Sequence, residues 1–215
     1  MDTVSDEALF VALEVVGTVA FATSGVIAAA RAGMDWLGGL VLAVVVAIGG
    51  GTMRGVLLGN LPIFWMESVW LVLLAMGTAV VLIAFLQWRP DSDLTRWLPL
   101  VVADAVGLSV FAVSGAEIGL IAGISGFNAV LLGVLTGVGG GVLRDILTGQ
   151  RPMVLVGQIY ALAAAAGATV FVVIVELGWQ SRWMVLLPLA VTIGLRLLAV
   201  ARDWQLPRVG RPRRA

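Results

Sequence analysis

The chain has no cysteine and no histidine among its 215 residues, and all 13 of its basic residues are arginines. Without these two residue types it has no disulfides, no thiolate chemistry and no histidine ligand or general base. No Walker loop, Gly-x-Ser-x-Gly elbow or EF-hand loop occurs in the sequence. We therefore expect a protein that is not an enzyme, with no cofactor and no metal beyond transiently bound monovalent cations.

Charge is also scarce: only 12% of the residues are charged, whereas soluble domains have about a quarter. Hydrophobic residues make up 60% of the chain, and the mean hydropathy is +1.07. Apolar stretches of about 20 residues are long enough to cross a bilayer as helices, and the alternation typical of a membrane barrel is missing. The composition predicts an all-α integral membrane protein, and its net charge of zero gives no reason to expect nucleic acid as a partner.

Glycine, proline and charge interrupt the apolar stretches at intervals that predict seven spans, at about 8–31, 36–60, 66–88, 98–121, 126–150, 155–177 and 183–203. With the N-terminus outside, nearly all loop arginines and the basic tail lie inside, as the positive-inside rule requires. We therefore expect a multi-pass protein of the cell inner (plasma) membrane with a cytoplasmic C-terminus. The arginines assigned to the inside are Arg31, Arg89, Arg96, Arg151, Arg208, Arg211, Arg213 and Arg214.

An internal repeat with an ungapped offset of 90 residues covers most of the first two spans. The matching positions include Phe21 and Phe111, Ser24 and Ser114, and the glycine triplets 49–51 and 139–141. Residues 1–215 thus form one transmembrane domain, with repeat one at 8–88, repeat two at 98–177, an extra helix at 183–203 and a basic tail at 204–215. Because each repeat has three spans, the second copy enters the membrane from the opposite face, as in inverted-repeat transporters and channels.

The two glycine triplets lie in the middle of the second and fifth spans. Each glycine costs a helix about 0.8–1 kcal/mol relative to alanine, so we expect both helices to bend or unwind there and to offer carbonyl groups to a cation. Close helix packing is the alternative, because glycine lets two helices approach. The six glycines are Gly49, Gly50, Gly51, Gly139, Gly140 and Gly141.

Five charges within the spans are candidate site residues: Glu14, Arg54, Asp104, Arg144 and Asp145. Such charges mark a pathway, a gate or a structural ion pair. Glu14 and Arg54 have matching depths from the outer face, and Asp104 and Arg144 have matching depths from the inner face. This arithmetic predicts two ion pairs, one at each end of a pathway.

Further polar candidates lie within the spans. Ser24 and Ser114 occupy equivalent positions and either bond their own backbone or, with Thr136, line a polar path. Arg196 lies nearer a span end, and we expect it to extend toward the membrane interface.

The segments Gly49-Gly50-Gly51-Thr52-Met53-Arg54 and Gly139-Gly140-Gly141-Val142-Leu143-Arg144-Asp145, each followed by Gly-x-x-Pro, resemble the prokaryotic trimeric intracellular cation (TRIC) channels. The same broad bacterial family includes proteins regarded as glycine transporters. The resemblance implies seven helices, a homotrimer in membrane lipid, and one pore in each protomer that conducts potassium and other monovalent cations, bordered by the kinked second and fifth helices.

One position departs from the family pattern, which has Arg-Asp after both triplets. Here Arg144-Asp145 is kept, but Arg54 is followed by Gly55, so the two halves should differ in charge. The sequence favours a cation channel or a small-solute carrier over a non-transporting scaffold, and it does not separate the first two.

Overall fold

The computed structural model describes residues 7–89, 92–156, 159–179 and 182–207, and helices make up most of these ranges. The four arginines of the basic tail predicted at 204–215 lie outside the described residues. The α-helices are α1 (Glu7–Arg31), α2 (Trp36–Leu58), α3 (Phe64–Glu67), α4 (Trp70–Trp88), α5 (Trp97–Ile121), α6 (Gly126–Leu147), α7 (Ala161–Glu176) and α8 (Leu186–Ala201). Short 3-10 turns are η1 (Asp93–Thr95), η2 (Met153–Leu155) and η3 (Arg182–Val185).

Six helical stretches are long and apolar enough to cross a membrane, and α7 is a shorter apolar helix of 16 residues. At 1.5 Å per residue α7 is about 24 Å long, below the roughly 30 Å of a hydrocarbon core. The protein is therefore a multi-pass, all-helical membrane protein. A count of seven complete spans stays a prediction.

Several helix ends differ from the predicted spans for local reasons. The helices α2 and α6 end at Leu58 and Leu147, because Gly59 and Gly149 adopt the left-handed conformation with φ of 69° and 71°. The third span begins at 70 rather than 66, because Ser68 is extended and separates α3 from α4. The sixth begins at 161 rather than 155, because η2 and a connecting segment come first.

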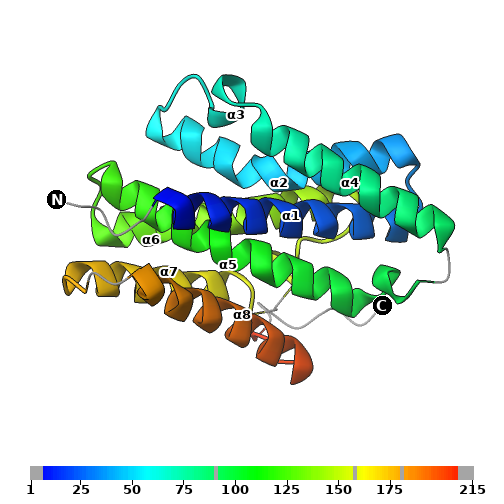
Figure 1. The fold of residues 1–215 in the computed structure, drawn as a ribbon. Helices are drawn as coiled ribbons and strands as arrows, with labels where there is room; N and C mark the ends of the chain where they lie inside the picture. The colour runs from blue at the N-terminus through cyan, green and yellow to red at the C-terminus, as the bar shows by residue number, and fades with distance from the viewer. Residues whose placement is uncertain (1–6, 90–91, 157–158, 180–181, 208–215) are drawn as a thin grey trace.

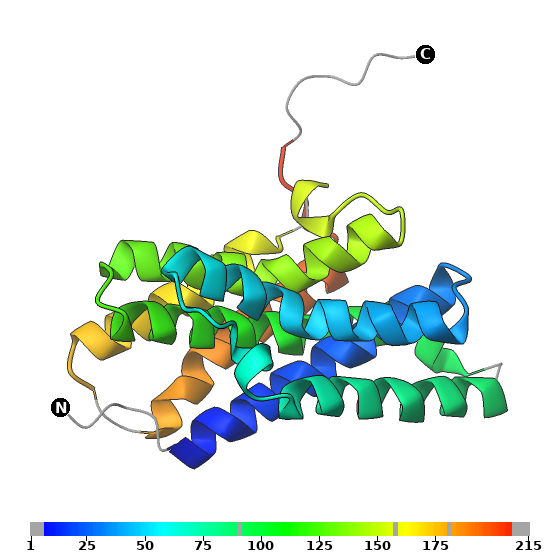
Figure 2. The same ribbon diagram turned by 90° about the horizontal axis from the view of Figure 1, so that it is seen from above.

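The helices lie side by side along one common direction, with α2 and α4 on one side of α1 and α5, and with α7 and α8 on the other (Figure 1). The view turned by 90° shows α2 beside α6 (Figure 2), and these two helices are in direct contact. Two buried apolar clusters fill the spaces between the helices.

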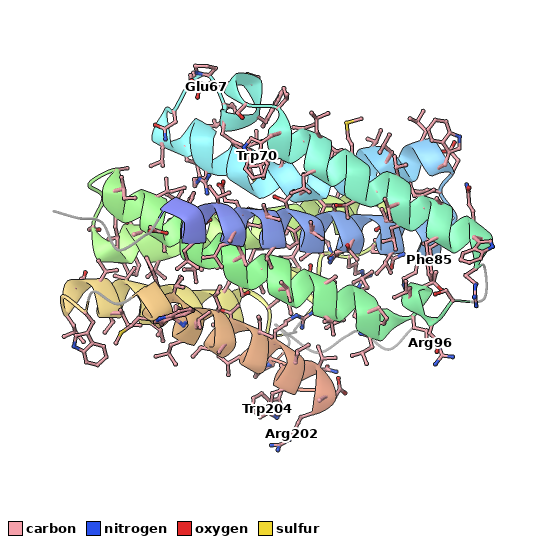
Figure 3. All side chains as sticks on the ribbon, in the orientation of Figure 1. Glu67, Trp70, Phe85, Arg96, Arg202 and Trp204 are labelled. Carbon is pink, nitrogen blue, oxygen red and sulfur yellow. The ribbon has the colours of Figure 1, made fainter. Side chains whose placement is uncertain are left out.

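The two ends of the bundle can be distinguished by the labelled residues Glu67 and Arg96 (Figure 3). Trp70 and Phe85 lie near opposite ends of α4 (Figure 3). Glu67 lies at the Trp70 end, whereas Arg96 lies at the Phe85 end, where it pairs with Asp93 at 2.7 Å. The predicted orientation puts the Arg96 end inside, and we use "inner" and "outer" for the two ends on that basis.

The glycine triplets lie where α2 crosses α6, and both helices continue through them without interruption. A Cβ added to Gly50 would overlap the carbonyl oxygen of Thr136, and one added to Gly140 would overlap that of Val46. The predicted unwinding is therefore wrong, whereas a bend at the triplets and a carbonyl site for a cation stay predictions. The triplets serve the alternative that the sequence left open, namely close packing of two helix backbones.

The contacts at this crossing are reciprocal. Gly50 faces Thr136 and Gly140 faces Val46, and each residue of one contact is 90 positions from its counterpart in the other. Helix ends follow the same offset, since α1 ends at 31 and α5 at 121, and α2 begins at 36 and α6 at 126. Reciprocal contacts of this kind are typical of two units that meet across a two-fold axis.

Candidate functional site

A network of charged side chains is buried between the inner halves of α1, α5 and α6. Arg144 of α6 is 1% exposed, and its Nη1 donates to Ser24 Oγ of α1 at 2.6 Å and to a carboxylate oxygen of Asp104 of α5. Asp104 is fully buried. The predicted ion pair between Asp104 and Arg144 is therefore present.

Asp145 joins this network from the same helix. Its Oδ1 accepts from Arg144 Nε at 2.9 Å, and its Oδ2 accepts from the backbone N–H of Met153 at 2.8 Å. Asp145 thus fixes the guanidinium and also secures the segment that follows α6. A carboxylate with two charge-assisted bonds is held in one orientation.

Tyr160, which precedes α7, completes the network. Its hydroxyl donates to Asp104 Oδ1 at 3.1 Å, and the guanidinium carbon of Arg196 lies 5.0 Å from the centre of its ring. Gly141 makes this arrangement sterically feasible, because a Cβ there would overlap the Tyr160 hydroxyl and come within 3.3 Å of Asp104 Oδ1.

Arg196 of α8 is fully buried, and its Nη2 lies 3.0 Å from the sulfur of Met153. The expectation that Arg196 extends to the membrane interface is therefore wrong. The stacking face of Tyr160 and the Met153 sulfur hold its guanidinium inside the bundle.

We call Ser24, Asp104, Arg144, Asp145 and Tyr160 the inner cluster. With Arg196, its two guanidinium groups balance its two carboxylates. Buried charges are tolerated only when such pairing offsets the several kcal/mol that each ion loses on leaving water. Removing one charge would leave another uncompensated.

A cavity of about 220 Å³ leads from the inner end of the bundle to the inner cluster. Arg144 and Asp145 of the inner cluster line it, together with Arg31 and Arg151. Asp104 Oδ2 is buried and accepts no hydrogen bond from the described residues. The inner cluster thus closes a cavity and retains one carboxylate oxygen with spare acceptor capacity.

The outer charges Glu14 and Arg54 are arranged differently. Both are half-buried and interact electrostatically, yet among the described residues no ion pair or hydrogen bond joins them. The predicted outer ion pair is therefore not formed here. At Gly55, the counterpart of Asp145 in repeat one, the Ile63 side chain packs within 3.1 Å of where a Cβ would stand.

The three hydroxyl residues that were predicted to line a polar path have different hydrogen-bond partners in the structure. Ser24 accepts from Arg144, Thr136 donates to its own helix at Leu132 O at 2.7 Å, and the buried Ser114 Oγ has no hydrogen-bond partner in the described part of the chain. Ser24 is thus part of the site, whereas Thr136 contributes its backbone carbonyl to the helix crossing.

Tyr160 is not among the predicted site residues, and Arg196 was expected at the membrane interface and not at the site. Tyr160 is the only tyrosine in the chain, and Arg196 is a charge within an apolar stretch, so both carried a signal. Their partners are 36 to 56 positions away in the sequence, so spacing alone did not connect them.

These features define a class of protein, namely a multi-pass helical membrane protein with a charged network at the end of a cavity. Comparison with known proteins narrows the class. A family model described as "Glycine transporter" matches residues 11–87 and 101–176, two segments that begin 90 positions apart. A UPF0126 membrane protein of Vibrio cholerae is 37% identical over 96% of this chain and 85% of its own length.

The inner membrane protein YadS of Escherichia coli K12, also of UPF0126, is 39% identical over 91% of this chain and 93% of its own. The crystal structure of the TRIC channel orthologue from Rhodobacter sphaeroides is 35% identical, with a TM-score of 0.83 over 90% of this chain and 98% of that one. The chain therefore belongs to the glycine-transporter (UPF0126) family, which is related to the prokaryotic TRIC channels. The resemblance noted from the glycine-arginine motifs is confirmed.

Proposed function

We propose that this protein is a cation channel for potassium and other monovalent cations, with a separate pathway in each protomer. The pathway passes between α1, α2, α5 and α6, the helices that carry all the candidate residues. The observation that carries the proposal is the inner cluster at the end of a membrane cavity, in a fold shared with TRIC channels.

The inner cluster supplies the chemistry of a cation gate. Asp104 and Asp145 attract a monovalent cation, and the Arg144 guanidinium occupies the position that such a cation would take between them. Displacement of that guanidinium would leave two carboxylates facing the cavity, and buried carboxylate oxygens are ligands for hard cations. Arg144 thus acts as a tethered cation that competes with the permeating ion.

The proposal includes the predicted architecture. Two three-helix units, α1, α2 and α4 with α5, α6 and α7, are inserted in opposite directions about a two-fold axis in the membrane plane, and the reciprocal contacts of the glycine triplets support this arrangement. The chain forms a homotrimer in the inner membrane, with its N-terminus outside.

Single-channel recording of the purified protein in planar bilayers tests the function. We expect discrete current steps in symmetric potassium chloride and a reversal potential that follows the potassium gradient. Asp145→Asn should lower the unitary current, because a charge at the cavity is lost, whereas Asp93→Asn, in an exposed pair, should not. Silent bilayers with a folded protein would contradict the proposal.

A glycine carrier is the second candidate, and the description of the matching family model favours it. A carrier and a channel are distinguished by the form of the flux. Saturable uptake of labelled glycine into proteoliposomes, without current steps, would support the carrier and exclude the channel.

A further inference from the structure

Ser24 and Ser114 are equivalent residues of the two repeats, but their hydroxyl groups differ in hydrogen bonding. They are 90 positions apart, and each lies seven residues before the end of its helix, at Arg31 in α1 and at Ile121 in α5. Ser24 accepts a hydrogen bond from Arg144, whereas Ser114 Oγ is buried and has no partner among the described residues. A buried hydroxyl without a partner is costly, so its position requires an explanation.

The residue equivalent to Arg144 is Arg54, and its guanidinium group is the candidate donor to Ser114. The Arg54 side chain makes no hydrogen bond or ion pair within the described part of the chain, and the charge of Glu14 acts on it at longer range. The helices are suitably placed, since α2 contacts α5 just as α1 contacts α6. The donor, the acceptor and the carboxylate of an outer cluster are therefore present but separate.

We propose that the protein has a second state in which Arg54 bonds Ser114 and Glu14 at the outer end while Arg144 leaves Ser24 and Asp104 at the inner end. This inference rests on the proposed function and adds to it a reciprocal exchange between two gates. The structure described here is then the state with the inner gate closed. Ser114 is a positioning residue of the outer gate.

The chain itself explains why the inner-closed state is the more stable one. The inner cluster has two carboxylates, Asp104 and Asp145, and the Tyr160 hydroxyl. At the outer end Gly55 occupies the position equivalent to Asp145, and the Ile63 side chain fills the space beside it. The outer cluster therefore has one carboxylate fewer for its arginine, and its closed state is weaker.

A single engineered thiol measures the balance between the two states, because the chain has no cysteine of its own. Ala28 lines the inner cavity beside the inner cluster and is only 7% exposed, so Ala28→Cys should react faster with a water-soluble maleimide when Arg144 leaves the cluster and the cavity widens. The protein is held in lipid nanodiscs, where both faces are accessible. The measured quantity is the rate of thiol modification.

In this background we expect Ser24→Ala to raise the rate and Ser114→Ala to lower it. Each change should be about fivefold, the effect of one net hydrogen bond on an equilibrium. The double variant should return toward the parent rate. Ser109→Ala is the matched control, because Ser109 is also buried in α5 but bonds its own helix at Val106 O at 2.8 Å.

A Ser114→Ala rate equal to that of the Ser109→Ala control, or above that of the parent, would overturn the inference. Because Ser114→Ala removes no hydrogen bond of the present structure, the variant should fold normally. The proposed function fails by a different result, the absence of ion current from the parent protein. Thiol modification needs no current, so the two failures are distinguishable.

Discussion

Phe21 and Phe111 stack on each other at the centre of the bundle, with ring centroids 5.2 Å apart and an interplanar angle of 22°. They are equivalent residues of the two repeats. A Cβ on Gly107 would overlap the Phe21 ring, and one on Gly17 would come within 3.1 Å of the Phe111 ring. The two repeats thus contact each other through two equivalent phenylalanines. Gly17 and Gly107 leave the space that the two rings occupy.

The helix crossing of α2 and α6 should not tolerate a side chain at Gly50. Gly50→Ala would drive a methyl group into the Thr136 carbonyl, and we expect a loss of about 1–3 kcal/mol in unfolding free energy. Gly77→Ala in α4 is the control, since nothing lies within 4 Å of that position and alanine favours helix. Thermal unfolding in detergent measures both, and equal melting temperatures would contradict the packing explanation.

Arg144→Ala should destabilise the protein by about 3–5 kcal/mol, because it leaves Asp104 and Asp145 buried without their cation. Adding Asp104→Ala should recover part of that loss, since one orphaned charge is then removed. Denaturant unfolding of the single and double variants gives the coupling energy, which we expect to be about 0.5–3 kcal/mol.

The exposed pair of Arg96 and Asp93 provides the control for this comparison of single and double variants, because both side chains are more than 70% exposed. Arg96→Ala should cost at most about 1 kcal/mol. Strictly additive losses in the Arg144 and Asp104 variants would mean that the buried pair does not act as a unit.

Tyr160→Phe should isolate the contribution of one hydroxyl. It removes the bond to Asp104 but keeps the ring against Arg196, so we expect a loss of about 1.5–3 kcal/mol, the range for a hydrogen bond to a charged group. Tyr160→Ala should cost more, because the ring contact is also lost. Unfolding free energies measure both variants, and a Tyr160→Phe variant as stable as the parent would assign the whole effect to the ring.

Gly55→Asp restores the missing Arg-Asp sequence of repeat one, yet we expect it to destabilise the protein by about 1–3 kcal/mol, because Ile63 occupies the space. Combining it with Ile63→Ala should relieve the clash and recover stability. A Gly55→Asp variant as stable as the parent, measured by thermal unfolding, would show that Ile63 does not block this position.

The proposed homotrimer is open to a direct measurement. Native mass spectrometry from mild detergent should give a species of three times the chain mass of 22.4 kDa. Monomer at every protein concentration would contradict the assembly.

The sequence predicted the helical membrane class, the positions of most helices and the pairing of Asp104 with Arg144. These follow from hydropathy, glycine punctuation and equal depth in the membrane, which are local or one-dimensional properties. The match of Asp104 and Arg144 succeeded because both lie a few residues from the inner ends of adjacent helices.

The predictions that were wrong concern features that depend on three-dimensional contacts. The glycine triplets indicated a break when judged by helix propensity alone, but each triplet packs against the opposite helix, and this contact compensates for the poor propensity. Equal depth also predicted a pair of Glu14 and Arg54, although depth does not fix the side-chain conformation. Arg196 looked interfacial because its partners, Tyr160 and Met153, come from distant parts of the sequence.

The crossing of α2 and α6 has a mechanical consequence. Helices usually engage through ridges of side chains that fit into grooves, and these fix the crossing angle. Here backbone lies against backbone at Gly50 and Gly140, and Leu143 and Met53 reach only the neighbouring Gly49 and Gly139, so fewer side chains have to disengage when the angle changes. The crossing is suited to serve as a fulcrum: rocking about it separates the helices at one membrane face as it brings them together at the other.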